Sequence, residues 1–158
     1  VALDRDTGRE LWRVRPAALD PALDRSYFQG TPLAAYDRVV ALVRRNQASG
    51  FQDTFVVAVS AADGSLLWKR HVSSAATASR YATGAAPQMT LHGGTVYVGD
   101  SLAAIAAIDS RTGAVRWTRV FPEATPVDER AQNPAQEERE PVGAPPVLVD
   151  AGLVVPPN

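Results

Sequence analysis

The chain has 158 residues, of which 46% are hydrophobic and 21% charged, so its composition is that of an ordinary folded domain. A net charge of −1 offers no positive field for phosphate backbones, which argues against general nucleic-acid binding. No window approaches the roughly 18 unbroken apolar residues of a membrane-spanning helix, and a chain without cysteine has no disulfide, thiolate metal site or cysteine nucleophile.

An eleven-residue motif begins the chain and recurs twice. Its copies align without gaps over residues 2–12, 58–68 and 107–117, and all three tryptophans of the chain fall in one column, 56 and 49 residues apart. Each copy also has an alanine and a glycine in fixed columns; the three sets are Ala2, Gly8 and Trp12, then Ala58, Gly64 and Trp68, then Ala107, Gly113 and Trp117. Self-similarity at this spacing indicates a repeat architecture.

Each motif predicts two strands joined by a tight turn, because apolar residues flank polar turn-forming ones. An aspartate that can accept hydrogen bonds from nearby backbone N–H groups caps the turn, and the glycine supplies the left-handed backbone that closes it. The predicted capping residues are Asp4 and Thr7 in the first copy and Asp109 and Thr112 in the third. In the middle copy Ser60 and Asp63 stand in these columns, so we expect a weaker cap.

A second hairpin is predicted ahead of each motif pair, from residues 30–33 with 38–43, 86–89 with 95–99, and 144–147 with 153–155. Gly93-Gly94 is a strong two-residue turn signal. Helical signals are confined to single turns at Asp20-Pro21 and Asn133-Pro134. Residues 122–141, rich in Glu, Gln, Pro and Ala, are predicted to form a surface loop. The repeating unit is therefore four strands.

The motif Ala-x-Asp-x-x-Thr-Gly-x-x-x-Trp resembles the tryptophan-docking repeat of the pyrroloquinoline-quinone (PQQ) type, found in quinoprotein propellers and in propellers similar to the outer-membrane assembly factors. The resemblance implies an all-β fold, a β-propeller whose blades are four antiparallel strands. It also implies that each motif tryptophan docks between neighbouring blades, with the motif glycines as platforms and the alanines as small contacts. The motif aspartates and threonines are then structural.

The domain organisation implied by this resemblance is a single propeller segment over 1–158 with two complete and two partial blades. We expect residues 1–16 to end one blade, 17–72 and 73–121 to form the complete blades, 122–141 to be the surface loop, and 142–158 to begin another blade. Such a segment would need other blades of the same parent chain as partners, and we expect the parent to be a larger exported protein.

No catalytic, cofactor-binding or metal-binding residue is predicted. A quinoprotein dehydrogenase would be expected to show an aspartate base, a calcium held by Glu and Asn, and often a cysteine pair, and none of these is identifiable. His71, expected after the outer strand, and His92, expected in a hairpin turn, lack a third ligand at metal spacing. The acidic run at residues 137–140 lacks the spacing of a calcium loop. No Ser-His-Asp constellation is apparent either.

Several polar and aromatic residues are predicted to lie in loops. Arg44 and Arg45 are interpreted as solvated loop residues. Tyr27, Phe28, Arg80 and Tyr81 are expected in loops before the first strand of their blades, where they would either cover blade edges or contribute to a binding surface.

The favoured hypothesis is a non-catalytic scaffold or protein-binding module in the periplasm or outside the cell, with protein partners and no cofactor. The alternatives are part of a PQQ-dependent alcohol or sugar dehydrogenase, which would bring PQQ and calcium, and the extracellular sensor domain of a membrane receptor. Because the dehydrogenase residues could lie in other blades, the hypothesis that the chain is not an enzyme stays open to test.

Overall fold

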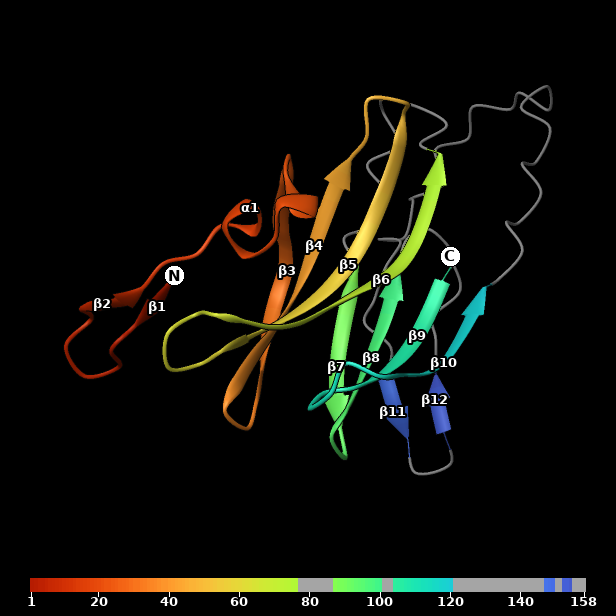
Figure 1. Ribbon diagram of the computed structural model, residues 1–158. Helices are drawn as coiled ribbons and strands as arrows, with labels where there is room; N and C mark the ends of the chain where they lie inside the picture. The colour runs from red at the N-terminus through yellow and green to blue at the C-terminus, as the bar shows by residue number, and fades with distance from the viewer. Residues whose placement is uncertain (77–86, 101–103, 121–146, 150–151, 155–158) are drawn as a thin grey trace, which may run out of the picture.

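Two four-stranded antiparallel sheets form the body of the protein (Figure 1). The structure is a computed structural model and describes residues 1–76, 87–100, 104–120, 147–149 and 152–154. The first sheet, here the first blade, is β3 (Ser26–Ala35), β4 (Arg38–Asn46), β5 (Phe51–Ser60) and β6 (Leu66–Ala76), paired in that order. The second blade is β7 (Gln88–His92), β8 (Thr95–Asp100), β9 (Ala104–Asp109) and β10 (Val115–Val120).

A two-stranded sheet flanks the blades on each side in the sequence. These are β1 (Ala2–Leu3) with β2 (Glu10–Trp12), and β11 (Val147–Val149) with β12 (Gly152–Val154). Between β2 and β3 lie two short helical turns, α1 (Pro16–Leu19) and the 3-10 turn η1 (Pro21–Leu23). Asp20 caps η1 by accepting a hydrogen bond from the Ala22 N–H at 2.7 Å, as the Asp20-Pro21 signal predicted. The Asn133-Pro134 turn lies outside the described residues.

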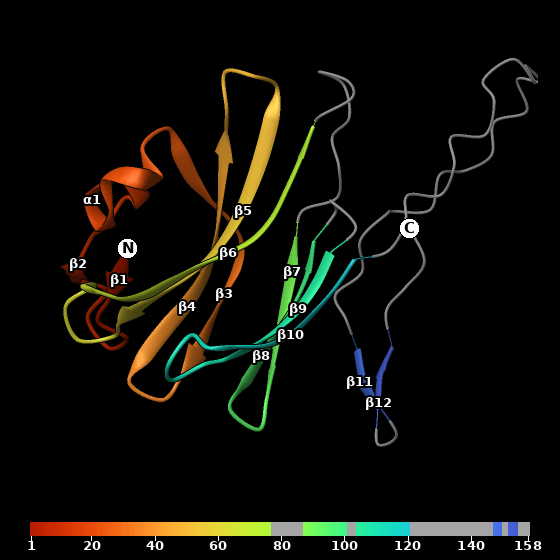
Figure 2. The same cartoon turned by 45° about the vertical axis from the view of Figure 1, so that its right-hand side comes forward.

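The sheets β3–β6 and β7–β10 lie side by side (Figure 2), and an apolar seam of buried side chains joins them. Alternation along the inner strands of both blades sends every second side chain into it, as the pleat of a strand requires. On β4, Val40 and Leu42 point into the seam and are at most 1% exposed, where they share a cluster with Val98 and Ile108 of the second blade. The blades are thin sheets, and the seam is the core between them.

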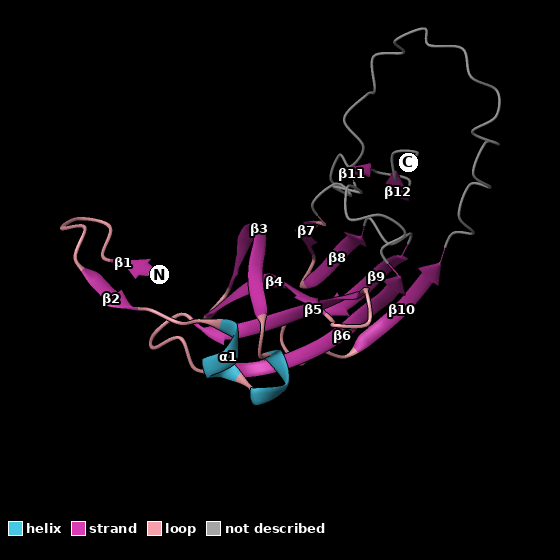
Figure 3. Ribbon diagram, turned by 90° about the horizontal axis from the view of Figure 1, so that it is seen from above, coloured by secondary structure: helices cyan, strands magenta, loops and turns pink. Residues whose placement is uncertain are grey.

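The opposite face of the first blade has its own small core. Val43 and Phe55 pack there with Leu23 of η1, which is fully buried. Seen from above, the helical turns cover the end of this sheet that lies nearer β1 and β2 (Figure 3). The first blade is therefore apolar on both faces, as expected of a sheet with neighbours on both sides.

The first strand of the first blade starts earlier than the sequence indicated. Because β3 begins at Ser26 rather than near Gly30, Tyr27 and Phe28 lie in a strand, and the prediction that they are loop residues is wrong. The register shifts between Gln29 and Leu33, and Gly30 has a φ of 75° within this bulge. An edge strand tolerates a bulge and a proline because one side of it has no ladder to break. Arg80 and Tyr81 lie outside the described residues.

Both histidines also lie in strands. His71 is within β6, opposite Phe55, because β6 continues to Ala76 rather than ending before it, so the prediction that it follows the strand is wrong. His92 is the last residue of β7 and pairs with Thr95, so the two-residue turn consists of Gly93 and Gly94 alone. Their φ values of 53° and 74° are the left-handed conformations that this turn requires.

Candidate functional site

The first and third motif turns have the same hydrogen-bonded shape. Asp4 Oδ1 accepts hydrogen bonds from the Thr7 N–H at 2.8 Å and the Thr7 hydroxyl at 2.6 Å. Asp109 Oδ1 accepts the equivalent bonds from Thr112 at 2.9 and 3.0 Å. The pKa of Asp4 is lowered, chiefly by the Thr7 side chain. The pKa of Asp109 is lowered much further, first by its bond from Arg116 and then by those from Thr112.

The middle turn reaches the same shape with other residues. Ser60 Oγ accepts a hydrogen bond from the Ala62 N–H at 3.2 Å, and Asp63 accepts from the Ser65 N–H at 2.9 Å and its hydroxyl at 2.7 Å. The Gly64 N–H donates to the Ser60 carbonyl at 2.9 Å, as the Gly113 N–H does to Asp109 at 2.8 Å. The weaker cap expected here stays a prediction.

Each of the first two motif tryptophans lies on the glycine turn of the following copy, not on its own. The indole N–H of Trp12 donates to the Ala61 carbonyl at 3.0 Å, and that of Trp68 donates to the Ser110 carbonyl at 3.1 Å. A Cβ added to Gly64 would lie 2.8 Å from the Trp12 ring, and one added to Gly113 would lie 2.6 Å from the Trp68 ring. Only glycine fits under either ring.

The motif alanines lie next to the tryptophans across the outer strand pair of each blade. Ala58 pairs with Trp68 and Ala107 with Trp117, and both alanines are fully buried. Ala2 pairs with Trp12 in the same way. A larger residue at this position of the motif would clash with the strands packed around it, which is the physical reason for a small side chain there.

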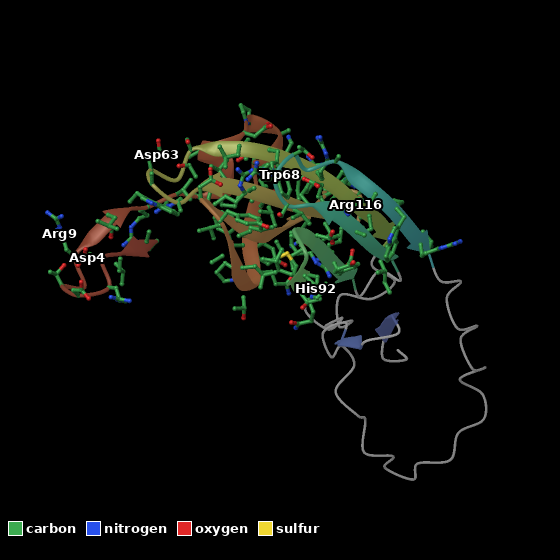
Figure 4. All side chains as sticks on the ribbon, turned by 90° about the horizontal axis from the view of Figure 1, so that it is seen from below. Asp4, Arg9, Asp63, Trp68, His92 and Arg116 are labelled. Carbon is green, nitrogen blue, oxygen red and sulfur yellow. The ribbon has the colours of Figure 1, made fainter. Side chains whose placement is uncertain are left out.

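Trp117, the third motif tryptophan, and Gly8, the first motif glycine, have no such docking partner among the residues that the structure describes. Trp117 is 40% exposed, and its ring lies 6.1 Å from that of Tyr97 on β8. A Cβ on Gly8 would meet nothing within 4 Å. Figure 4 shows the turn carrying Asp4 and Arg9 projecting away from both four-stranded sheets.

Two arginines of the first blade contact the third motif turn, and the sequence did not reveal them. Arg38 of β4 donates to the Arg111 carbonyl, and Arg70 of β6 donates to the Gly113 carbonyl. With Trp68, three donors of the first blade therefore bind one turn of the second. The aligned motif copies do not single out Arg70, because the residue two positions after the tryptophan is Val14 in the first copy.

The prediction that Arg44 is a solvated loop residue is wrong. Arg44 lies in β4, is 2% exposed, and pairs with Asp100 of the second blade at 2.9 Å. Ser73 also donates to Asp100, and Arg44 donates to Gln52. In the sequence, two adjacent arginines stand at the polar end of a strand. Arg44 becomes buried only because the second sheet packs against it.

Arg45 faces the other side of the same blade. Its guanidinium donates to Asp53 Oδ2 at 2.6 and 2.8 Å and to the Ala22 carbonyl at 2.7 Å, tying η1 to the sheet. Burial raises the pKa of Asp53, but hydrogen bonds from Ser74, Arg45 and Gln47 outweigh it, and the pKa is lowered overall. The prediction of a solvated loop residue is wrong here too.

A serine, a histidine and an aspartate meet beside this ion pair, which the sequence did not indicate. His71 Nε2 lies 2.9 Å from Ser74 Oγ and 3.7 Å from Asp53 Oδ1. In a catalytic triad the carboxylate binds Nδ1 while Nε2 takes the serine proton. Here serine and carboxylate lie at the same ring nitrogen, and Ser74 donates to Asp53 itself. The cluster holds strands together and does not activate a nucleophile.

Among the residues that the structure describes, no three or more His, Cys, Asp or Glu side chains gather as metal ligands would. The acidic run at 137–140 lies outside those residues. No helix in the described part of the chain is long and apolar enough to cross a membrane.

Stacked four-stranded antiparallel sheets joined by tryptophan–glycine contacts define a β-propeller built from PQQ-like repeats. The chain belongs to the family described as outer membrane protein assembly factor BamB, whose model matches residues 1–148. The crystal structure of BamB from Moraxella catarrhalis is similar, with a TM-score of 0.55 and 25% identity over 94% of this chain and 37% of that one. The all-β fold and the family resemblance predicted from the sequence are thereby confirmed.

A curated relative is named as a dehydrogenase. The polyvinylalcohol dehydrogenase of Sphingopyxis sp. (strain 113P3) is 28% identical over 148 residues, covering 75% of this chain and 22% of that protein. The chain thus spans well under half the length of both proteins to which it is compared.

Proposed function

We propose that this propeller segment is a non-catalytic scaffold that binds proteins, and that its parent protein acts in the assembly of outer-membrane proteins. The observation that carries the proposal is how the motif residues are used. The aspartates and threonines cap turns, and Trp12 and Trp68 lie on the glycine turn of the next copy. The polar groups of the motif are thus engaged in building and joining blades.

The family supports this role. The model that covers nearly the whole chain is that of an outer membrane protein assembly factor, and the similar solved structure is a BamB. We place the parent protein in the periplasm, at the outer membrane, on this ground. Its binding partners would be other proteins rather than nucleic acid, given a net charge of −1.

A PQQ-dependent dehydrogenase is the second candidate, because the curated relative oxidises an alcohol polymer, as its name states. The described residues of this chain bring no support of their own to it. Among the described residues the buried aspartates are Asp53 and Asp100, and each is engaged in an ion pair with an arginine.

Two assays on the whole protein separate the candidates. Deletion of the gene in its host should lower the amount of folded outer-membrane β-barrel protein, and complementation should restore it. The purified protein, supplied with PQQ and Ca²⁺, should not reduce an artificial dye when alcohols are added. Alcohol-dependent dye reduction together with unchanged outer-membrane protein levels would reject the scaffold proposal in favour of the dehydrogenase.

A further inference from the structure

The middle motif turn differs in its chemistry from the other two. Its glycine follows an aspartate, as Asp63-Gly64, whereas the other two copies have threonine before the glycine. No other Asp-Gly or Asn-Gly step occurs in the sequence. Figure 4 shows Asp63 at the tip of the hairpin between β5 and β6, where the residue is exposed. The middle copy therefore places a carboxyl group one residue ahead of a glycine amide.

An aspartyl-glycyl step can rearrange without any co-reactant except water. The Gly64 backbone nitrogen attacks the Asp63 side-chain carboxyl carbon and forms a five-membered succinimide, while the amide proton and the carboxyl hydroxyl leave as water. Hydrolysis of this ring at the Asp63 main-chain carbonyl takes up one water and leaves an isoaspartyl linkage, which makes the main chain one methylene longer. Glycine favours the attack because it has no Cβ to hinder it. The reaction requires a free amide nitrogen and a neutral carboxyl group, since a carboxylate is a poor electrophile.

The folded turn opposes both requirements. The Gly64 N–H donates to the Ser60 carbonyl at 2.9 Å, so the nitrogen is held away from the attack. Asp63 Oδ1 accepts hydrogen bonds from the Ser65 N–H at 2.9 Å and from its hydroxyl at 2.7 Å. These bonds lower the pKa of Asp63, the N–H more than the hydroxyl, so the carboxyl group stays ionised at neutral pH.

Trp12 holds the glycine peptide from outside the turn. A Cβ built on Gly64 would lie 2.8 Å from the Trp12 ring, and the indole N–H donates to the Ala61 carbonyl at 3.0 Å. Gly64 is buried under this ring, although the turn residues on either side of it are exposed. The peptide between residues 63 and 64 must rotate before its nitrogen can reach the carboxyl carbon, and the ring lies against the glycine that has to move. The reaction therefore requires Trp12 to leave the turn.

We propose that Asp63-Gly64 is a site of isoaspartate formation controlled by Trp12: it is unreactive while the ring lies on the turn and reacts once the ring has left. The added methylene changes the spacing of the turn on which Trp12 lies, so a converted chain loses this contact. Conversion would thus mark, irreversibly, those chains in which the first motif has separated from the first blade. This modification goes beyond the scaffold function and does not depend on it.

The test follows conversion in the purified 158-residue chain, kept at neutral pH for several weeks and then digested with trypsin. The tryptic peptide 46–69 contains the site, and reversed-phase chromatography with electron-transfer fragmentation separates its isoaspartyl form from the ordinary form of equal mass. The folded wild-type chain should convert at least about tenfold more slowly than the synthetic peptide 46–69, because only the opened turn reacts. Trp12→Ala should convert about tenfold or more faster than the wild type, because it raises the population of the opened turn.

Two variants serve as matched controls. Trp117→Ala removes a tryptophan from the same position of the motif but on the second blade, and should convert at the wild-type rate. Asp63→Thr installs the residue of the other two copies and should give no product at this step. Circular dichroism establishes that each variant is folded. Trp12→Phe, which keeps a ring but has no N–H donor, should convert at a rate between those of the wild type and Trp12→Ala, and it replaces Trp12→Ala if that variant does not fold.

Two results would overturn the proposal. One is a folded wild-type chain that converts as fast as the free peptide, since the turn would then give no protection. The other is a folded Trp12 variant that converts no faster than the wild type, since the protection would then come from the turn alone.

Discussion

Replacing Trp68 with alanine is the sharpest test of the seam. The side chain is 7% exposed and packs in the apolar cluster shared by both blades, and its N–H binds the Ser110 carbonyl. Deleting a buried aromatic side chain costs about 3–5 kcal/mol, and the carbonyl left without its donor adds about 1 kcal/mol. For a chain of this size, each kcal/mol lowers Tm by about 2–4 °C, so we expect a fall of at least about 8 °C.

The matched variant is Trp117→Ala, which removes the same side chain from the same column of the motif. Because Trp117 is 40% exposed and makes one ring contact among the described residues, its loss should lower the free energy of unfolding by less than about 2 kcal/mol. Urea unfolding followed by circular dichroism measures both values on one scale. We expect burial in the seam, and not the position in the motif, to set how much each tryptophan contributes to stability. Equal losses of unfolding free energy for the two variants would refute this.

Three further predictions concern the same seam. Gly113→Val should lower the free energy of unfolding by about 2 kcal/mol or more in urea titrations, because the Trp68 ring lies over the glycine. Gly8→Val, which has no ring over it, should cost only the roughly 1 kcal/mol of a left-handed backbone, and the reverse order of the two losses would contradict the contact. Arg44→Ala should lower the free energy of unfolding by about 3–5 kcal/mol, because it leaves Asp100 buried without this partner. The double variant Arg44→Met with Asp100→Leu should recover most of that loss in thermal melts, and a double variant whose loss equals the sum of the two single losses would disprove this. Because the pKa of Asp109 is lowered in the folded state, its carboxylate stabilises the fold above the ordinary pKa of 3.8, and this contribution is lost as the pH falls toward the folded pKa. Asp109→Asn should therefore lower Tm at pH 7 and flatten the dependence of Tm on pH below about 4. Parallel curves of Tm against pH for the two proteins would rule this out.

The features that could be predicted are those that local chemistry decides. A repeated Asp-x-x-Thr-Gly turn closes on itself through bonds among its own residues, and Asp20 before Pro21 caps a helical turn in the same local way. The strand alternation around these turns is also local. Such patterns identify the four-stranded unit without reference to any other part of the chain.

The features that were missed depend on strands and sheets that only the folded structure brings together. Arg44 and Arg45 are adjacent and identical in type, and only the position of the second blade makes one of them a buried partner of Asp100. His71 and Ser74 approach Asp53 because β5 and β6 pair in one register. No residue within a few positions of any of them carries that information.

The sequence by itself determined that the chain is a succession of four-stranded units with a tryptophan, a glycine and an alanine in fixed columns, because turn closure and alternation act over a few residues. Only the tertiary structure decided which turn each tryptophan contacts. Trp68 lies on Gly113 rather than on its own Gly64, and Arg38 and Arg70 join it there, because stacking of one twisted sheet on the next brings together groups 43 to 73 residues apart.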